Sequence, residues 1–310
     1  MIEAAESLSF CAIVKNEERV LARCLDSVRE LAREMIVVDT GSTDATPRIA
    51  ADYGANVIAF DFAVADFAAA RNRALAHASG QWILVLDADE ALDPRDAPLI
   101  RQLIARGENA GYYFHRLNFL ANSKTPATDY VVRLFPNRPD YRYQGRVHET
   151  IDASILAGGG RLARSGIRIH HDFGADPETR RRRNLWYIGI LNEEIAANPG
   201  DDSRLDFLAA EYHQLGLFDQ AAEVAERIVA ARPLDPQAHL HAGVYHLVYK
   251  GDHQRARADF MAALGLRPGY SEAQAFLHLM DEQDRAARSE PSPVPVGRFT
   301  SPAESARKPM

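Results

Sequence analysis

Two acidic residues at the end of an apolar segment are the strongest chemical signal in the chain. The segment Trp82–Leu86 is followed directly by Asp87-Ala88-Asp89. Alternate residues of an extended strand point to the same side, so the two carboxylates can converge. Converging carboxylates repel one another unless a proton or a cation lies between them, and oxygen ligands favour Mg²⁺ or Mn²⁺. The alternative is a solvated acidic turn, because Asp-x-Asp also arises by chance.

A second polar cluster follows another apolar segment. Asp39 ends the run Val37-Val38-Asp39, and Thr40-Gly41-Ser42-Thr43-Asp44 comes next. Asp39 could accept a hydrogen bond from a nucleobase imide or a ribose hydroxyl. Ser42, Thr43 and Asp44 could instead cap a following helix. Both interpretations can hold, because they use different residues.

The elements that would position these clusters alternate between strand and helix. Apolar runs predict buried strands over Ser9–Val14, Met35–Asp39 and Trp82–Asp87, and later over Gly111–Leu117, Val131–Pro136 and Ile167–His171. Helical patterns cover Glu17–Arg29, Thr46–Tyr53 and Phe67–Ala78. This alternation is typical of an α/β domain with a mostly parallel sheet and flanking helices, whose ligands bind at the carboxyl ends of the strands. Both polar clusters lie at such ends.

The second half of the chain has a helical repeat. Pro199, Pro233 and Pro268 follow helical patterns and are 34 and 35 residues apart. This period resembles that of tetratricopeptide repeats. We predict a domain over residues 1–178, an all-α tetratricopeptide-like domain over 179–285, and a disordered Pro-rich tail over 286–310. The concave face of such repeats could bind an acceptor or a protein partner.

Composition restricts the class of protein. The chain has 310 residues and a net charge of −7, which argues against a nucleic-acid partner. No apolar run approaches the roughly 18 residues of a membrane span, and Glu3 and Glu6 without a basic region argue against a secretory signal. Cys11 and Cys24 could form a disulfide, but we expect two buried thiols in a reducing compartment. We therefore expect a cytoplasmic protein, with peripheral contact at the inner membrane face left open.

Several motifs together resemble family 2 glycosyltransferases. In chain order they are Ala12-Ile-Val-Lys-Asn-Glu-Glu, Val37-Val-Asp-Thr-Gly-Ser-Thr-Asp, Ala70-Arg-Asn-Arg-Ala-Leu and Trp82-Ile-Leu-Val-Leu-Asp-Ala-Asp-Glu, followed by Arg133-Leu-Phe-Pro-Asn and Gly145-Arg-Val-His-Glu. The resemblance covers residues 8–175. It implies a GT-A fold, a nucleotide-sugar donor, a divalent metal (Mn²⁺ or Mg²⁺) and inversion at the anomeric carbon. Uridine diphosphate is the family's commonest carrier, so we expect a UDP-sugar.

The resemblance also implies roles for individual residues. Glu17 and Asp39 would hold the nucleoside, Arg71 would reach the nucleotide near its base or phosphates, Asp87 would contact the ribose or donor sugar, and Asp89 would ligate the metal. For Arg71 the alternative is a structural ion pair with Asp66 or Asp89.

The acceptor half of the motif set supplies the remaining candidates. Inverting transfer needs a base for the acceptor hydroxyl, and we assign Glu149, whose alternative is a surface carboxylate. One of His170 and His171 could complete the metal shell, as a histidine does in related enzymes; His171 fits better, and neighbours on a strand face opposite ways. Arg180–Arg183 could meet the diphosphate or an anionic acceptor, although at least two of the four are expected to be solvated.

The sequence therefore predicts transfer of a sugar to a hydroxyl of a glycan, a lipopolysaccharide-type molecule or a protein, in cell-envelope glycan synthesis. The alternative is a repeat-based protein-binding scaffold with an inactive transferase domain. A nucleotidyltransferase would want a glycine-rich phosphate loop after the first strand, where this chain has Lys15-Asn16-Glu17-Glu18. No G-x-G-x-x-G follows a strand, which argues against a nicotinamide dehydrogenase.

Overall fold

The structure, a computed structural model, describes residues 7–120, 125–173 and 177–289. The chain forms two compact units, Met1–Leu215 and Gly216–Met310. The predicted division into a transferase domain and a repeat domain between residues 178 and 179 concerns function, and it stays a prediction. The Glu3 and Glu6 positions and residues 290–310 of the predicted tail lie outside the described residues.

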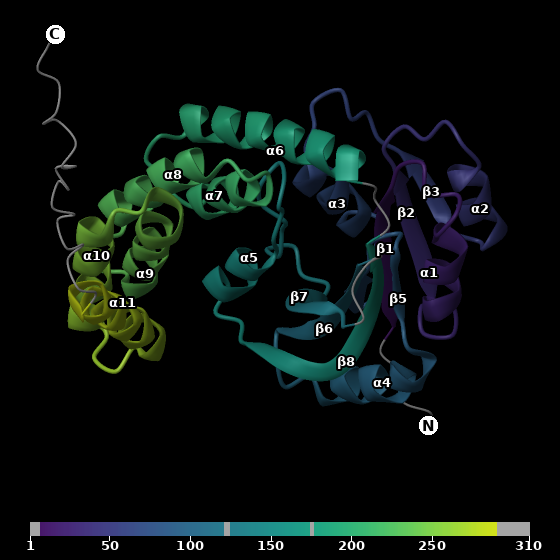
Figure 1. The fold of residues 1–310 in the computed structure, drawn as a ribbon. Helices are drawn as coiled ribbons and strands as arrows, with labels where there is room; N and C mark the ends of the chain where they lie inside the picture. The colour runs from purple at the N-terminus through teal and green to yellow at the C-terminus, as the bar shows by residue number, and fades with distance from the viewer. Residues whose placement is uncertain (1–6, 121–124, 174–176, 290–310) are drawn as a thin grey trace, which may run out of the picture. The chain divides into compact units, whose positions relative to one another are not determined.

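A mixed sheet forms the centre of the first unit (Figure 1). The described residues give eight strands in the order β3-β2-β1-β4-β7-β6-β8-β5. Their bounds are β1 Leu8–Val14, β2 Glu34–Asp39, β3 Asn56–Ala59, β4 Trp82–Val85, β5 Glu90–Leu92, β6 Gly111–Leu120, β7 Ala127–Pro136 and β8 Leu162–Phe173. The pairs among β3, β2, β1 and β4 are parallel, whereas β7 pairs antiparallel with both β4 and β6, and β5 pairs antiparallel with β8. The predicted α/β class is confirmed, with a parallel first half and a mixed second half.

The first unit also contains helices (Figure 1). They are α1 Leu21–Val28, α2 Thr46–Asp52, α3 Phe67–Leu75, α4 Ala97–Arg106, α5 Asp152–Ala157, α6 Pro177–Ala197 and α7 Leu205–Gln214, with a 3₁₀ turn η1 at Pro94–Asp96. Residues of α1 to α5 pack against the sheet, whereas α6 and α7 pack on each other. Helix α1 begins later than predicted because the backbone of Glu17 and Glu18 is engaged elsewhere. The Glu17 amide donates to Thr46 Oγ1 (2.7 Å) and the Glu18 amide donates to Asp44 Oδ2 (3.2 Å).

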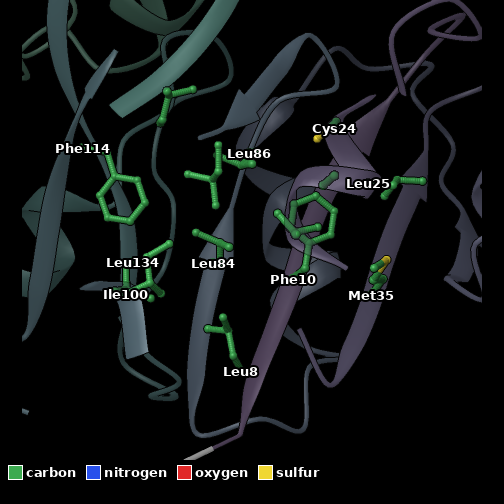
Figure 2. Packing of buried hydrophobic residues seen from close by; sticks show 14 of the residues in the cluster. Leu8, Phe10, Cys24, Leu25, Met35, Leu84, Leu86, Ile100, Phe114 and Leu134 are labelled. Atoms are coloured by element: carbon green, nitrogen blue, oxygen red, sulfur yellow. The ribbon is translucent and has the colours of Figure 1, made fainter. Parts of the chain in front are cut away.

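Buried side chains cover both faces of the sheet. On one face, Phe10 of β1 and Leu84 of β4 pack with Leu25 of α1 (Figure 2). On the other face, Cys11 and Ile83 belong to a second cluster that includes residues of α3 and α5. A strand that is buried on both faces has a continuous run of apolar residues, which is why these strands could be predicted. Cys11 and Cys24 are free and buried, as expected.

The second unit is helical. Its elements are α8 Phe218–Ala231, α9 Pro236–Val244, a π-helical segment η2 Tyr245–Lys250, α10 His253–Leu266 and α11 Ser271–Ser289. Successive helices pack on one another around Phe260 and Ala256, both fully buried. Pro233 and Pro268 lie between helices, as the repeat predicts. No helix in the described ranges is both long and apolar enough to cross a membrane.

Candidate active site

A cavity of about 440 Å³ lies where β1 and β4 end. Its wall includes Val14 at the end of β1, Lys15 directly after it and Ala88 after β4. Six of the seven predicted site residues line it: Glu17, Arg71, Asp87, Asp89, Glu149 and His171. Asp39 is not among the described residues that line it, although its neighbour Thr40 is. Residues that are up to 154 positions apart in the sequence, from Glu17 to His171, therefore come together at one edge of the sheet.

A tight turn after β4 separates the two acids of the Asp-x-Asp motif. The Glu90 amide donates to the Asp87 carbonyl, and the Asp87 amide donates to Glu90 Oε2, both at 3.0 Å. Strand β5 then begins at Glu90, which lies opposite His171 of β8 in the antiparallel register. The turn and the register together bring Asp89 beside His171.

Asp87 lies between two arginines. Arg71 Nη2 donates to its Oδ1 and Arg133 Nη2 donates to its Oδ2, each at 2.6 Å. Burial alone would raise the pKa of Asp87, but the charges of Arg133 and Arg71 outweigh it and hold that pKa well below its ordinary range. The sequence suggested two carboxylates converging on one cation. In the structure Asp87 is neutralised by guanidinium groups instead.

Arg71 links Asp87 to Glu149. Its Nε donates to Glu149 Oε1 at 2.6 Å, and the two side chains are 8% and 11% exposed. The suggested structural partners of Arg71, Asp66 and Asp89, are not the ones found, because Asp66 instead accepts a hydrogen bond from the amide of Ala69 and caps α3. Glu149 is thus a nearly buried cavity residue and not the surface carboxylate of the alternative interpretation.

Arg133 and Arg116 complete the ionic network, and no role was predicted for either. Arg133 Nη2 also donates to Glu90 Oε1 at 2.6 Å, and Arg116 Nη1 donates to the same oxygen at 3.2 Å. Glu90 is fully buried and Arg133 is 5% exposed. One signal was available for Arg133: an arginine in the apolar run Val131–Phe135 needs a carboxylate partner if the run is buried. Arg116 carried no comparable signal.

Asp89 and His171 form the second polar pair of the cavity. His171 Nε2 is 3.1 Å from Asp89 Oδ2, and its Nδ1 donates to Asn118 Oδ1 at 2.6 Å. Burial lowers the pKa of His171, but the hydrogen bond and the charge of Asp89 outweigh it and raise the pKa overall. His170 faces another way and stacks on Phe119, with ring centroids 5.7 Å apart. Of the two histidines, only His171 lines the cavity in the described part of the chain.

Glu17 follows β1 and Asp39 is the last residue of β2, and the loops after these two strands are bound to each other. The Asn16 amide donates to Ser42 Oγ (2.9 Å), and Asn16 Oδ1 accepts from the Thr43 amide (2.8 Å). Ser42 and Thr43 therefore bind the neighbouring loop, which neither of the sequence interpretations included. Asp39 accepts the Ser42 amide on both carboxylate oxygens at 3.2 Å. Burial and the nearby acids, Asp89 first among them, raise the pKa of Glu17 to about 7.

Helix α6 contributes to the cavity wall through Arg183 and Tyr187. Arg181 and Arg182 are exposed, as expected for at least two of the four arginines at this helix start. Tyr187 carried no chemical signal in the sequence.

Residues 9–169 match the family described as Glycosyl transferase family 2. The chain belongs to glycosyltransferase family 2. The match contains β2 to β7, β1 without its first residue and β8 without its last four, together with every cavity residue named above except those of α6 and His171. The family resemblance suggested by the motifs is therefore confirmed.

Curated relatives of this glycosyltransferase share part of its length. A TPR repeat-containing protein of Synechococcus elongatus is 44% identical over 154 residues, which are 50% of this chain and 38% of that protein. The SPbeta prophage-derived glycosyltransferase SunS of Bacillus subtilis is 23% identical over 230 residues, 70% of this chain and 52% of that protein. The chain thus spans between about a third and a half of the length of these relatives.

Solved structures also align with this chain, with TM-scores below 0.5. TarS residues 1–349 of S. aureus in complex with UDP-GlcNAc aligns with a TM-score of 0.48 and 14% identity, covering 91% of this chain and 92% of that one. Glucosyl-3-phosphoglycerate synthase of Mycobacterium tuberculosis in complex with Mn²⁺, UDP and glucosyl-3-phosphoglycerate aligns with a TM-score of 0.30 and 27% identity, covering 38% of this chain and 45% of that one.

Proposed function

We propose that this family 2 glycosyltransferase moves a sugar from a UDP-sugar to an acceptor hydroxyl, with inversion and with the help of a divalent cation. The observation that carries the proposal is the charged cavity at the ends of β1 and β4. There the Asp89–His171 pair lies in the same space as Asp87 and Glu149. A nucleotide-diphosphate donor needs cationic groups for its phosphates and a base near the sugar, and this cavity has candidates for both.

Asp89 and His171 are suited to hold Mn²⁺ or Mg²⁺. Both ring nitrogens of His171 face oxygen atoms, and a cation between Nε2 and Asp89 would take the place of a proton shared by those two groups. Asn118 would keep the Nε2 lone pair directed at the ion through its hydrogen bond to Nδ1.

The protein alone would leave that ion incompletely coordinated. Within the described ranges, no group of three or more His, Cys, Asp or Glu side chains could hold a metal. Mg²⁺ and similar ions are often bound by one or two carboxylates plus substrate phosphates and water, so two protein ligands fit a substrate-assisted site. A cation bound there would supply charge neutralisation for the departing diphosphate.

The remaining cavity residues would hold the donor. Glu17 and Asp39 would contact the nucleoside, with Glu17 inside the cavity and Asp39 at its margin beside Thr40. Arg71 would bind near the nucleotide phosphates while keeping Asp87 in place. Asp87, which is 31% exposed, has a carboxylate edge that could accept a ribose or sugar hydroxyl.

Glu149 is the proposed base. Arg71 occupies its Oε1, and no hydrogen bond to Oε2 is found among the described residues, so Oε2 could accept the proton of the acceptor hydroxyl. The acceptor oxygen would then bond to the anomeric carbon, and the electrons of the broken carbon–oxygen bond would pass to the diphosphate. The acceptor class we propose is a hydroxyl of a glycan, a lipopolysaccharide-type molecule or a protein, reached in the cytoplasm or at the inner face of the membrane.

A protein-binding scaffold with an inactive transferase domain is the alternative. The helical repeats of the second unit would support partner binding in either case. The full set of charged residues in the cavity favours an active enzyme, because a scaffold would not need to retain a buried network of this cost.

A thermal-shift series tests the proposal. The melting temperature is measured with UDP, UDP-glucose and UDP-N-acetylglucosamine, each with and without Mn²⁺. Binding to the native state raises the melting temperature by mass action, so we expect a shift that requires both nucleotide and Mn²⁺. Asp89→Asn should abolish the Mn²⁺-dependent part. Asp52→Asn, which alters a 63% exposed carboxylate on α2, is the matched control and should keep the full shift. An unchanged shift in Asp89→Asn would remove the metal assignment, and no shift in wild type would favour the scaffold.

A further inference from the structure

The loop that carries Glu149 is closed on itself and bound to helices α6 and α7. Gln144 and Thr150 exchange two backbone hydrogen bonds of 3.0 and 3.1 Å, so residues 145–149 form a compact turn between them. Val147 is fully buried at the centre of the turn. Gly145 has a φ of +97°, in the left-handed region that favours glycine. The loop is therefore a defined structure with few ways to relax.

Arg146 fixes the first half of this loop. Its amide donates to Glu194 Oε1 (2.9 Å) and its Nη1 lies 2.7 Å from Glu193 Oε2, both on α6. Its carbonyl accepts the amide of Phe67 at the start of α3 (2.8 Å). These contacts set the path of the chain but do not reach Glu149.

His148 fixes the second half of the loop between Gln144 and Thr150. Its φ is +49°, a left-handed value that residues other than glycine rarely adopt unless contacts hold the backbone there. The imidazole stacks on Phe207 of α7, with centroids 4.9 Å apart and planes 1° from parallel. Tyr187 of α6 meets the ring edge-on at 5.2 Å. Two helices, α6 and α7, therefore hold the residue directly before Glu149.

Glu211 of α7 supplies the charge in this contact. It is 2% exposed, and its Oε1 lies 2.9 Å from His148 Nε2, close but without the alignment of a hydrogen bond. Its Oε2 is buried and has no hydrogen-bond partner in the described part of the chain. A buried carboxylate is costly unless a cation or donor is next to it, and the imidazole of His148 is the group placed to serve.

We propose that Phe207 and Glu211 are positioning residues that hold His148 in its left-handed conformation and so set the carboxylate of Glu149 in the cavity. The inference rests on the proposed function only in its last step, the use of Glu149 in transfer. In this proposal α7 supports the cavity of the first unit, although we predicted that residues 179–285, which include this helix, belong to the repeat domain.

Amide hydrogen exchange of the loop, followed by mass spectrometry, tests the holding role without any substrate. In Glu211→Gln and in Phe207→Leu, exchange of residues 144–150 should be roughly 10- to 100-fold faster than in wild type, the size expected when a contact to a charged group is lost. Gln214→Ala is the matched control: it removes an α6–α7 hydrogen bond to Asn184 (3.2 Å) that does not touch the loop, and exchange there should stay at the wild-type rate. Wild-type exchange in both test variants would overturn the proposal.

Release of UDP from UDP-glucose and UDP-N-acetylglucosamine with Mn²⁺ tests the consequence. Glu211→Gln should lower kcat by roughly 10- to 100-fold with little change in the donor KM, because displacing a reacting group by about 1 Å has this effect. His148→Gly, which accepts a left-handed backbone, should keep more kcat than His148→Ala, and adding Glu211→Gln to His148→Gly should cost little more. An equal loss in both backgrounds would refute the link through His148. If wild type releases no UDP at all, the proposed function fails, while the exchange experiment still decides whether the loop is held as described.

Discussion

Replacing Arg133 by methionine is the sharpest structural test of the cavity. The change removes the guanidinium that bonds Asp87 and Glu90 at 2.6 Å each, while a methionine keeps most of the side-chain volume. Glu90 is fully buried, so its charge cannot be solvated in place. Arg71 still bonds Asp87 at 2.6 Å, and Arg116 still reaches Glu90 at 3.2 Å.

The expected loss follows from these remaining contacts. Removing one partner of a buried ion pair costs about 3 to 5 kcal/mol, because the other charge is left buried and unpaired. Arg116 and Arg71 compensate in part, and Asp87 is 31% exposed toward the cavity, so we expect a value near the lower end, about 3 kcal/mol. Most of this loss of stability comes from Glu90, whose buried charge loses a guanidinium partner.

Urea unfolding followed by tryptophan fluorescence is the assay. The chain has two tryptophans, Trp82 and Trp186, and both lie in the first unit, so the signal follows that unit and not the second. This matters because a chain with two compact units need not unfold in one step. Arg138→Met is the control: Arg138 and Asp140 are an exposed pair (51% and 43%), and its loss should cost no more than about 1 kcal/mol.

The difference in the free energy of unfolding between Arg133→Met and wild type should also depend on pH. The pKa of Asp87 is held below its ordinary 3.8, so the stabilisation that its ion pairs give is present above about pH 4 and is lost as the pH falls through the native pKa. The free-energy difference should therefore shrink in acid. A loss below about 1 kcal/mol at pH 7, equal to that of the control, would refute the reasoning and mean that the network contributes no more than a surface ion pair.

Three further changes have defined outcomes. Glu17→Gln should stabilise the metal-free protein by about 1 to 2 kcal/mol at pH 8 but not at pH 4. The pKa of Glu17 is raised from 4.5 to about 7, so ionising this carboxyl lowers the free energy of unfolding as the pH rises through that interval. If the assignment is wrong, urea unfolding at several pH values would show a constant difference in free energy between the variant and wild type. Glu149→Gln should keep the nucleotide-dependent thermal shift and lose UDP release to an acceptor, whereas retained turnover would remove Glu149 as the base. Gly243→Ala should destabilise the second unit by about 1 to 3 kcal/mol in thermal circular dichroism, since its Cβ would lie 2.6 Å from the ring of the buried Phe260; an unchanged transition would mean that the ring moves freely.

The strands that could be predicted are those with a continuous apolar run. β1, β2 and β4 are buried on both faces, so hydrophobicity alone identifies them. β3 has exposed ends and β5 has three residues, and neither leaves a pattern long enough to recognise. The antiparallel pairing of β7 with β4 depends on contacts between distant segments, which a local pattern does not contain.

The candidate site shows the same division between local and distant information. Acids at strand ends and the resemblance to family 2 glycosyltransferases together predicted which side chains would reach the cavity, and six of the seven do. Their partners could not be predicted, because Arg133 is 46 positions from Asp87 and His171 is 82 from Asp89. Local hydrogen bonds also shifted the predicted start of α1 from Glu17 to Leu21, since the preceding residues bind the next loop.

Anomalous diffraction from a crystal grown with Mn²⁺ and UDP would show whether Asp89 and His171 hold the metal. We expect one manganese peak within coordination distance of a carboxylate oxygen of Asp89 and of His171 Nε2, next to the diphosphate, with Asp87 still held by its two arginines. Manganese bound elsewhere, or UDP bound in this cavity with no metal between Asp89 and His171, would contradict this expectation.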